Sequence, residues 1–105
     1  MTSNPLLAGL GPTHPGEILR EDILPALGIS KTEVARLLGI SRQTLHDVLG
    51  ERQPVTPAMS LRLAKLLGSS PQLWINLQRD YDIDVLSESM REELAAIPTL
   101  PRDAA

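Results

Sequence analysis

The stretch that decides the fold is KTEVARLLGISRQTLHDV, residues 31–48. Glycine most easily adopts the left-handed conformation that ends a helix, and serine is among the best N-cap residues. The sequence Gly39-Ile40-Ser41 therefore predicts that one helix stops and another starts. Apolar residues recur at helical spacing on each side of this joint: Val34, Ala35 and Leu38 before it, and Leu45, Val48 and Leu49 after it. We expect two short helices that each pack through one apolar face.

The second of these expected helices also carries a continuous polar face. Its members lie at positions i, i+1, i+4 and i+5 and are Arg42, Gln43, His46 and Asp47. The joint before it is short, and Ile40 is apolar where a solvent-exposed loop would carry a polar residue. We therefore expect Ile40 to be buried and the two helices to cross at a steep angle, with the polar face turned outward.

The same stop-and-start pattern divides the rest of the chain. Ser30 precedes Glu33 by three residues, which is the spacing of a reciprocal capping box, and Pro57 and Pro71 each follow an N-cap residue. Pro25 is expected to end the first helix, because the residue before a proline avoids the helical region. These marks predict five helices and a sixth near the C-terminus: Pro15–Leu24, Lys31–Leu38, Arg42–Leu49, Pro57–Leu67, Pro71–Asp82 and Glu88–Ile97.

Length and composition favour one all-α domain. A chain of 105 residues can bury one modest core, and with no Phe and a single Trp that core must be built from aliphatic side chains. No strand-like alternation competes with the helical patterns, so we expect a compact bundle of about five helices. We divide the chain into a flexible leader (1–12), a domain ending in a dimerisation helix (13–86), and a short helix with a flexible acidic tail (87–105).

The composition also bounds the environment and the chemistry. Without cysteine, the chain has no disulfide, no thiol nucleophile and no cysteine-ligated metal. Neither a signal peptide nor a run of 18 apolar residues occurs, so we expect a cytoplasmic protein with no membrane partner. His14 is expected on a tail and His46 on the surface, and no metal-ligand, phosphate-loop or nucleophile motif accompanies them. We expect no metal, no cofactor and no enzymatic activity.

Charge is distributed unevenly along the chain. The formal net charge of −3 argues against indiscriminate coating of nucleic acid. Residues 31–65 nevertheless hold six basic and three acidic side chains, whereas residues 79–103 hold three basic and seven acidic ones. An ordinary solvated surface would also explain scattered charges, so the basic middle is only a weak indication of nucleic-acid binding.

Residues 31–48 resemble the helix-turn-helix of phage-repressor-like regulators, which implies a lambda-repressor-like fold. Ala35 stands where the helices cross closely and Gly39 stands in the turn, with apolar residues in register at Val34, Leu38, Ile40, Leu45 and Val48. The resemblance implies that the second helix lies in the major groove of DNA while the first crosses the phosphates. A generic bundle with Gly-Ser joints would explain each joint separately, but not this register.

This docking assigns roles to the side chains around the joint. Arg42 and Gln43 are best placed for bases, since Arg pairs with guanine and Gln with adenine through two hydrogen bonds each. Asp47 would repel the DNA backbone unless it accepts from cytosine N4 or pairs with Arg52, and both alternatives stay open. The expected base contacts are Ser41, Arg42, Gln43, Thr44, His46 and Asp47, and the expected phosphate contacts are Lys31, Thr32 and Arg52.

Sequence-specific binding by such a module usually needs two copies on half-sites about 34 Å apart, so we expect a homodimer. The helix that follows Ser70 carries Trp74, which is expected in the core. Farther along the same helix, Tyr81, Ile83 and Val85 are expected to pair with the second subunit.

A narrower resemblance covers most of the chain, from Thr13 to Leu86. HPGEILRED (14–22), VTPAMSLRLAKLLG (55–68) and SPQLWINLQRDYDI (70–83) make the chain similar to the HigA family of antitoxins. The resemblance implies an autorepressor that binds double-stranded operator DNA and that also binds and neutralises a HigB-type toxin, a ribonuclease of the RelE type. The toxin would dock on Met1–Asp22 or on the acidic Asp80–Glu93. The alternative is a free-standing repressor without a toxin partner.

Overall fold

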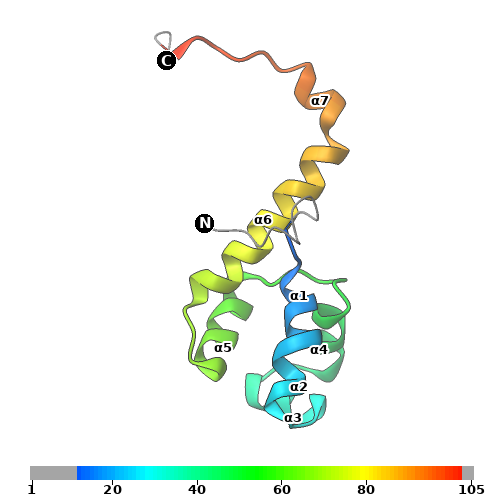
Figure 1. Ribbon diagram of the computed structural model, residues 1–105, viewed down its shortest axis with the longest axis vertical. Helices are drawn as coiled ribbons and strands as arrows, with labels where there is room; N and C mark the ends of the chain where they lie inside the picture. Colours follow the sequence, from blue (N-terminus) through cyan, green and yellow to red (C-terminus); the bar gives the residue numbers. More distant parts are fainter. Residues whose placement is uncertain (1–11, 103–105) are drawn as a thin grey trace.

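The computed structural model describes residues 12–102, and all regular structure within them is helical (Figure 1). The all-α expectation is confirmed, and three helices keep the bounds predicted from their caps. α4 packs against α3 and α1, while α5 packs against α3 and α6. The order is α1 (Pro15–Ile18), η2 (Leu19–Ile23), α2 (Leu24–Leu27), α3 (Lys31–Leu38), α4 (Arg42–Leu49), α5 (Pro57–Leu67), α6 (Pro71–Ser89) and α7 (Arg91–Ala95).

The first helical rod is longer than predicted, because Pro25 does not end it. α1, η2 and α2 follow one another directly to Leu27, and Gly28 ends the rod with a φ of 70°. η2 is a π-helical segment, after which the Leu24 N–H donates to the Leu19 carbonyl five residues back. This wide turn leaves room for the proline ring, which has no N–H to leave unpaired. The predicted stop at Pro25 is therefore wrong.

Side-chain caps and glycines set most helix ends, as predicted. A side-chain oxygen accepts the N–H three residues further on at four starts: Ser30, Ser41, Thr56 and Ser70. Gly39 and Gly68 end α3 and α5 with φ values of 73° and 70°. The capping box at Ser30 is only half formed, because the Glu33 carboxylate pairs with Arg36 on the next turn of α3.

The core is mainly aliphatic and lies between α3, α4 and the helices that flank them. Ile40, in the joint, is partly buried and packs against this core, and Trp74 of α6 is buried as predicted, with Nε1 donating to Ser69 Oγ at 2.9 Å. The buried side chains of α3 and α4 are Val34, Ala35, Leu38, Leu45, Val48 and Leu49. These apolar faces determine which sides of the two helices are left to solvent.

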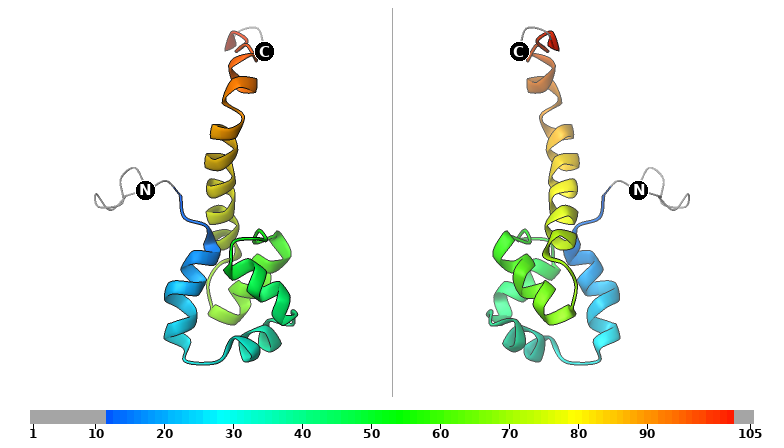
Figure 2. Two further views of the ribbon diagram at one scale, coloured as in Figure 1. Left: turned by 90° about the vertical axis from the view of Figure 1, so that its right-hand side faces the viewer. Right: turned by 90° about the vertical axis from the view of Figure 1, so that its left-hand side faces the viewer.

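α6 is the longest helix and rises well beyond the rest of the bundle (Figure 1, Figure 2). Neither Gly nor Pro interrupts residues 82–90, so α6 continues to Ser89, and the predicted end at Asp82 is wrong. The last helix is correspondingly shorter than predicted, Arg91–Ala95. The part of the chain after Asp82 forms a C-terminal arm. Its exposed apolar side chains are Ile83, Val85, Leu86, Leu94, Ile97 and Leu100.

Between residues 12 and 102, no helix combines the length and the apolar character that crossing a bilayer requires. The expected leader lies outside the described residues except for Pro12, and so does the end of the expected tail, from Asp103 onward.

Candidate nucleic-acid interface

The polar face of α4 lies at the surface, beside the first turn of α3. The apolar side of α4 is buried in the core, and this leaves Arg42, Gln43 and His46 exposed. A shallow groove connects these side chains to α3 and is lined by Lys31, Thr32, Arg42, Gln43, Leu45 and His46. The fold therefore brings two predicted phosphate contacts and three predicted base contacts into one concave surface.

Two further predicted base contacts, Ser41 and Thr44, are bonded to each other. The Ser41 hydroxyl oxygen accepts from the Thr44 N–H at 3.0 Å and donates to Thr44 Oγ1 at 2.8 Å. This N-cap fixes the first turn of α4. It also leaves the Thr44 hydroxyl hydrogen to point elsewhere, since that oxygen is the acceptor in the pair.

Asp47 links the polar face of α4 to the loop that follows it. Its Oδ1 accepts from Gln43 Nε2 at 2.9 Å and from Arg52, at 3.1 Å from Nη2 and 3.3 Å from Nε. Of the two alternatives that the sequence left open for Asp47, the structure contains the pairing with Arg52. The Asp47 side chain is 21% exposed and the Arg52 side chain 55%, so the carboxylate is the more enclosed partner.

A left-handed residue turns the chain so that Arg52 can reach Asp47. Glu51 has a φ of 62°, the one positive φ outside glycine within residues 12–102. This conformation costs a non-glycine residue on the order of 1 kcal/mol or more. The Arg52 N–H then donates to the Asp47 carbonyl at 2.8 Å. Backbone and side-chain bonds therefore join the same two residues, and they offset the strain at Glu51.

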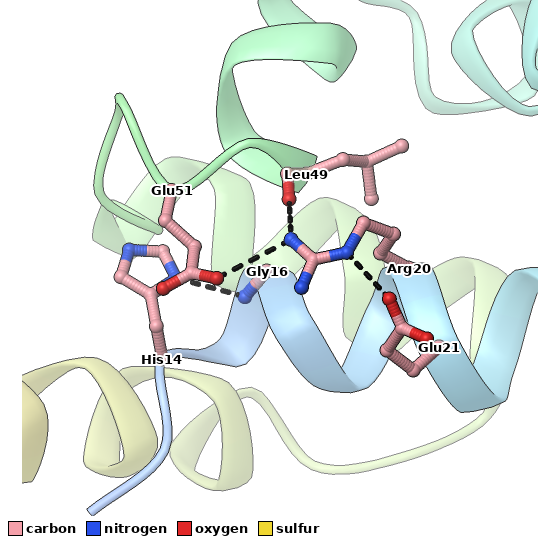
Figure 3. A network of polar contacts seen from close by, with 6 residues as sticks. All are labelled: His14, Gly16, Arg20, Glu21, Leu49 and Glu51. Atoms are coloured by element: carbon pink, nitrogen blue, oxygen red, sulfur yellow. Dashed lines mark hydrogen bonds and ion pairs between the residues drawn. The ribbon is translucent and has the colours of Figure 1, made fainter.

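Two arginines from other helices bond to the C-terminal ends of α3 and α4. Arg20 of η2 donates from Nη1 to the carbonyl of Leu49, the last residue of α4, at 2.6 Å, and lies 3.3 Å from the Glu51 carboxylate (Figure 3). Arg62 of α5 donates to the carbonyl of Leu38, the last residue of α3, at 2.7 Å. A cation is favoured at this end of a helix, where the carbonyls are unpaired.

The sequence did not indicate that Arg20 and Arg62 support the two helices of the interface. Their acceptors are backbone carbonyls 29 and 24 residues away in the chain, and a backbone carbonyl leaves no signature in the sequence. Only the packing of η2 and α5 against the joint reveals these contacts.

His14 is buried and does not lie on a tail, so that expectation is wrong. It is 3% exposed, and its Nδ1 accepts from the Gly16 N–H at 2.9 Å as the N-cap of α1. Its ring packs against that of Tyr81 in a T-shaped pair, with 4.9 Å between the ring centroids and 80° between the ring planes. Burial lowers the pKa of His14, while the nearby carboxylates of Glu51 and Asp82 oppose that shift.

Gly16 brings the start of α1 against the end of α4. It is buried, and a Cβ at this position would overlap the carbonyl oxygen of Val48. Together with the His14 cap and Pro15 at the first helical position, this contact explains the sequence His-Pro-Gly at residues 14–16 physically. These residues attach α1 to the helix that carries the polar face.

The basic side chains near the groove differ in how they are paired. Arg36 and Arg52 each form an ion pair with a carboxylate of the same region. Within residues 12–102, no ion pair involves Lys31 or Arg42. Those two cations therefore supply most of the uncompensated positive charge of the groove. The same part of the chain contains no cluster of three metal-ligating side chains.

The residues predicted to join two subunits lie on α6, away from this groove. Ile83 is 56% exposed and Val85 46% exposed. Tyr81 is half-buried and its ring is in contact with His14 of its own chain. Ile83 and Val85 are thus accessible to a second subunit, whereas much of Tyr81 is already covered within its own chain.

Comparison with known proteins places the fold among DNA-binding regulators. Residues 19–74 match the helix-turn-helix family model HTH_3. The uncharacterized HTH-type transcriptional regulator YbaQ of Escherichia coli is 34% identical over 91 residues, which cover 85% of this chain and 80% of YbaQ. The Pseudomonas aeruginosa antitoxin HigA, solved with the higBA promoter, has a TM-score of 0.80 and 33% identity over 86% of this chain and 99% of that chain. The antitoxin GraA in complex with its operator has a TM-score of 0.81 and 34% identity, over 96% and 99% of the two chains.

Proposed function

The chain belongs to the helix-turn-helix family, in which its structural neighbours are HigA antitoxins, and from that membership we propose an antitoxin that represses its own operon. The observation that carries the DNA-binding part is the groove between α3 and α4, where polar and basic side chains face outward from two firmly capped helices. HigA and GraA, which were solved with promoter and operator DNA, support DNA binding by a protein of this fold.

In this proposal α4 enters the major groove of the operator. Arg42 and Gln43, in its first turn, reach the base edges, and hydrogen bonds from Ser41, Thr44 and His46 add to the readout. Lys31, Thr32 and Arg52 bond to phosphates and fix the register of the protein on the duplex. One copy makes few such contacts, so specific binding at physiological salt calls for two copies.

We infer that the second copy pairs through α6, with Ile83 and Val85 at the interface. Ile83 belongs to an apolar groove between the start of α5 and α6, which supports this placement, and the groove includes Pro54, Val55, Pro57, Ile75, Ile83 and Leu86. Tyr81 contributes only through the part of its ring that His14 leaves uncovered. Two linked modules can then occupy two half-sites at once.

The toxin-binding half of the proposal rests on the family relationship. We infer that a HigB-type toxin docks on Asp80–Glu93 in preference to Met1–Asp22. Besides Ile83 and Val85, which the second copy would cover, this segment carries the exposed Leu86 and a surplus of acidic residues, which suits a basic, RNA-cutting partner. In the N-terminal segment, by contrast, His14 to Gly16 and Leu19 are buried in the bundle. Such a protein acts in the cytoplasm, where operator and toxin are found.

The DNA-binding proposal is tested with a gel-shift titration on the DNA upstream of the reading frame. Arg42→Ala should weaken binding by about 1–3 kcal/mol and relax the preference at one base. Arg52→Ala should weaken binding to all sequences alike, because phosphates carry no sequence. Arg91→Ala, an exposed residue of α7 paired with Glu88, is the matched control and should leave the affinity unchanged. Unchanged affinity for both interface variants would contradict the docking.

The antitoxin proposal is tested by co-expression with the product of the neighbouring small reading frame. We expect the chain to restore growth and to co-purify with a basic protein. The second candidate is a free-standing repressor, which the relationship to the regulator YbaQ favours. The free-standing repressor is favoured if the chain binds its operator but no product of a neighbouring gene is toxic or co-purifies with the chain.

A further inference from the structure

We infer that Asp47 sets base specificity by positioning Gln43 and restraining Arg52, and does not itself contact a base. This inference rests on the proposed docking of α4 in the major groove. It assigns Asp47, an acidic residue on a DNA-facing helix, the role of a positioning residue that acts through its two neighbours.

The first step is the orientation of the Gln43 amide. An ionised carboxylate only accepts hydrogen bonds, so the amide atom that faces Asp47 must be the nitrogen. The 2.9 Å bond from Gln43 Nε2 to Asp47 Oδ1 therefore directs Gln43 Oε1 away from Asp47. One hydrogen of Nε2 is used in this bond, and the other remains free. Gln43, which is exposed, thus presents one acceptor and one donor in a fixed order.

The second step is the base that this arrangement fits. In the major groove adenine offers the N6 amine as a donor and N7 as an acceptor, which match Oε1 and the free Nε2 hydrogen of Gln43. Guanine offers two acceptors, O6 and N7, so the Gln43 oxygen would face another oxygen. Without Asp47 the amide could rotate by 180° and accommodate either purine less selectively. The pairing with Asp47 therefore selects adenine over guanine.

The third step concerns charge. Arg52 donates to Asp47 from both Nε and Nη2, so the aspartate offsets a positive charge at the edge of the interface. The backbone bond from the Arg52 N–H to the Asp47 carbonyl keeps the two residues together. An arginine held in this way binds phosphates less strongly than a free one. Asp47 thus lowers non-specific affinity while it sharpens the readout by Gln43.

The inference is tested by selection from randomised DNA duplexes with the full chain, a method that works whatever the operator sequence is. We expect the wild-type protein to select adenine at one position of each half-site, about tenfold or more over guanine. Gln43→Ala and Asp47→Ala should both lose this preference at that same position and keep the others. The double variant should lose no more than either single variant, because the two residues act as one unit.

A second readout separates positioning from a general loss of structure. Asp47→Ala should bind a non-specific duplex more tightly than wild type, and the slope of log affinity against log salt should steepen by up to about 0.9, the value for one fully formed phosphate contact, because Arg52 is no longer restrained. Adding Arg52→Ala to Asp47→Ala should remove this gain and leave the slope shallower than that of wild type, since the phosphate contact of Arg52 is then lost altogether. Thermal melting of each variant verifies that it is folded.

The possible failures are distinguishable. If the wild-type chain enriches no sequence, the proposed DNA-binding function fails, and the inference fails with it. If Asp47→Ala changes a position different from the one that Gln43→Ala changes, Asp47 contacts a base itself and the inference is overturned. If Asp47→Ala retains the full wild-type preference while Gln43→Ala loses it, Asp47 does not position Gln43, and the inference is overturned as well.

Discussion

Arg20 donates a hydrogen bond of 2.6 Å to the carbonyl oxygen of Leu49, the residue that ends the proposed DNA-reading helix. Arg62 makes the corresponding bond to Leu38 at the end of the other helix of the joint. Each helix of the helix-turn-helix is thus held at its C-terminal end by an arginine from a different part of the chain. The orientation of α4 in the molecule therefore depends on η2 as well as on the turn at Gly39.

Arg20→Ala should lower the free energy of unfolding by more than a surface ion pair contributes. The variant loses a charge-assisted bond to a helix C-terminus and the contacts with Glu51 and Glu21, and the loss is moderated because the Arg20 side chain is 35% exposed. Urea unfolding followed by circular dichroism measures the change. The control is Arg91→Ala, whose side chain is 72% exposed and, within residues 12–102, forms an ion pair only with the exposed Glu88. Because surface ion pairs are weak, its effect should stay within about 0.5 kcal/mol. Equal effects in the two variants would show that the bond to Leu49 adds no stability.

Gly16→Ala should destabilise the fold by about 1–3 kcal/mol, because the added methyl group overlaps a backbone oxygen that cannot rotate away. α1 must then move from the end of α4, so operator affinity should fall as well. Gly50→Ala is a matched control for stability alone, since the atoms nearest to a Cβ there belong to the flexible end of the Arg52 side chain. Thermal unfolding of both variants checks the prediction, and a Gly16 variant as stable as wild type would disprove the close packing of α1 on α4.

Acid should destabilise the protein through His14. Its folded-state pKa is lowered by burial from a reference of 6.5, so the unfolded chain binds the proton more readily. The stabilising contribution is therefore complete above the unfolded-state pKa and is lost as the pH falls from about 6.5 through the folded-state pKa. Protonation also places a hydrogen on Nδ1, which then cannot cap Gly16.

The pH dependence is measured as urea unfolding between about pH 8 and 5, where histidine titrates. The comparison is His14→Asn, which keeps a good N-cap acceptor but does not titrate. The other groups facing His14 are Glu51, Asp82, Arg20 and Tyr81, and they are common to both proteins. The wild type should lose more stability across this range than the variant. Parallel curves would show that His14 binds its proton equally in the folded and unfolded states.

Local signals explain what the sequence predicted about the fold. The bounds of α3, α4 and α5 follow from Gly39, Ser41 and Thr56, because caps act within a few residues of their own position. The helix end at Pro25 and the end of α6 at Asp82 were predicted wrongly, each for its own reason. A π-helical turn can accommodate a proline, and a helix without Gly or Pro ahead of it need not stop where its buried face ends.

The candidate site was predicted in part for the same reason. Periodicity on one helix is enough to turn Arg42 and Gln43 outward, since the buried face of α4 is local information. Arg20 and Arg62, by contrast, bond to carbonyls that lie 29 and 24 residues away in the chain. The burial of His14 likewise depends on packing against Tyr81 of another helix. Sequence spacing alone contains no measure of such distances.

The dimer proposal is tested with Ile83→Asp. Ile83 is 56% exposed on α6, so a charge there should leave the monomer folded but should abolish an apolar interface between two copies. Tyr81→Asp should also yield monomers, but Tyr81 contacts the ring of His14, so that variant weakens the fold at the same time. Ile83 therefore gives the cleaner measurement.

Sedimentation velocity with the full chain should show a dimer for wild type and a monomer for Ile83→Asp, with unchanged circular dichroism. Leu61→Asp is the matched control, because Leu61 is 62% exposed on α5 and lies outside the proposed interface. Loss of the dimer should reduce operator affinity by more than any single base contact, since each half-site then binds independently. A stable dimer in Ile83→Asp would move the interface away from α6, and a monomeric Leu61→Asp would move it to α5.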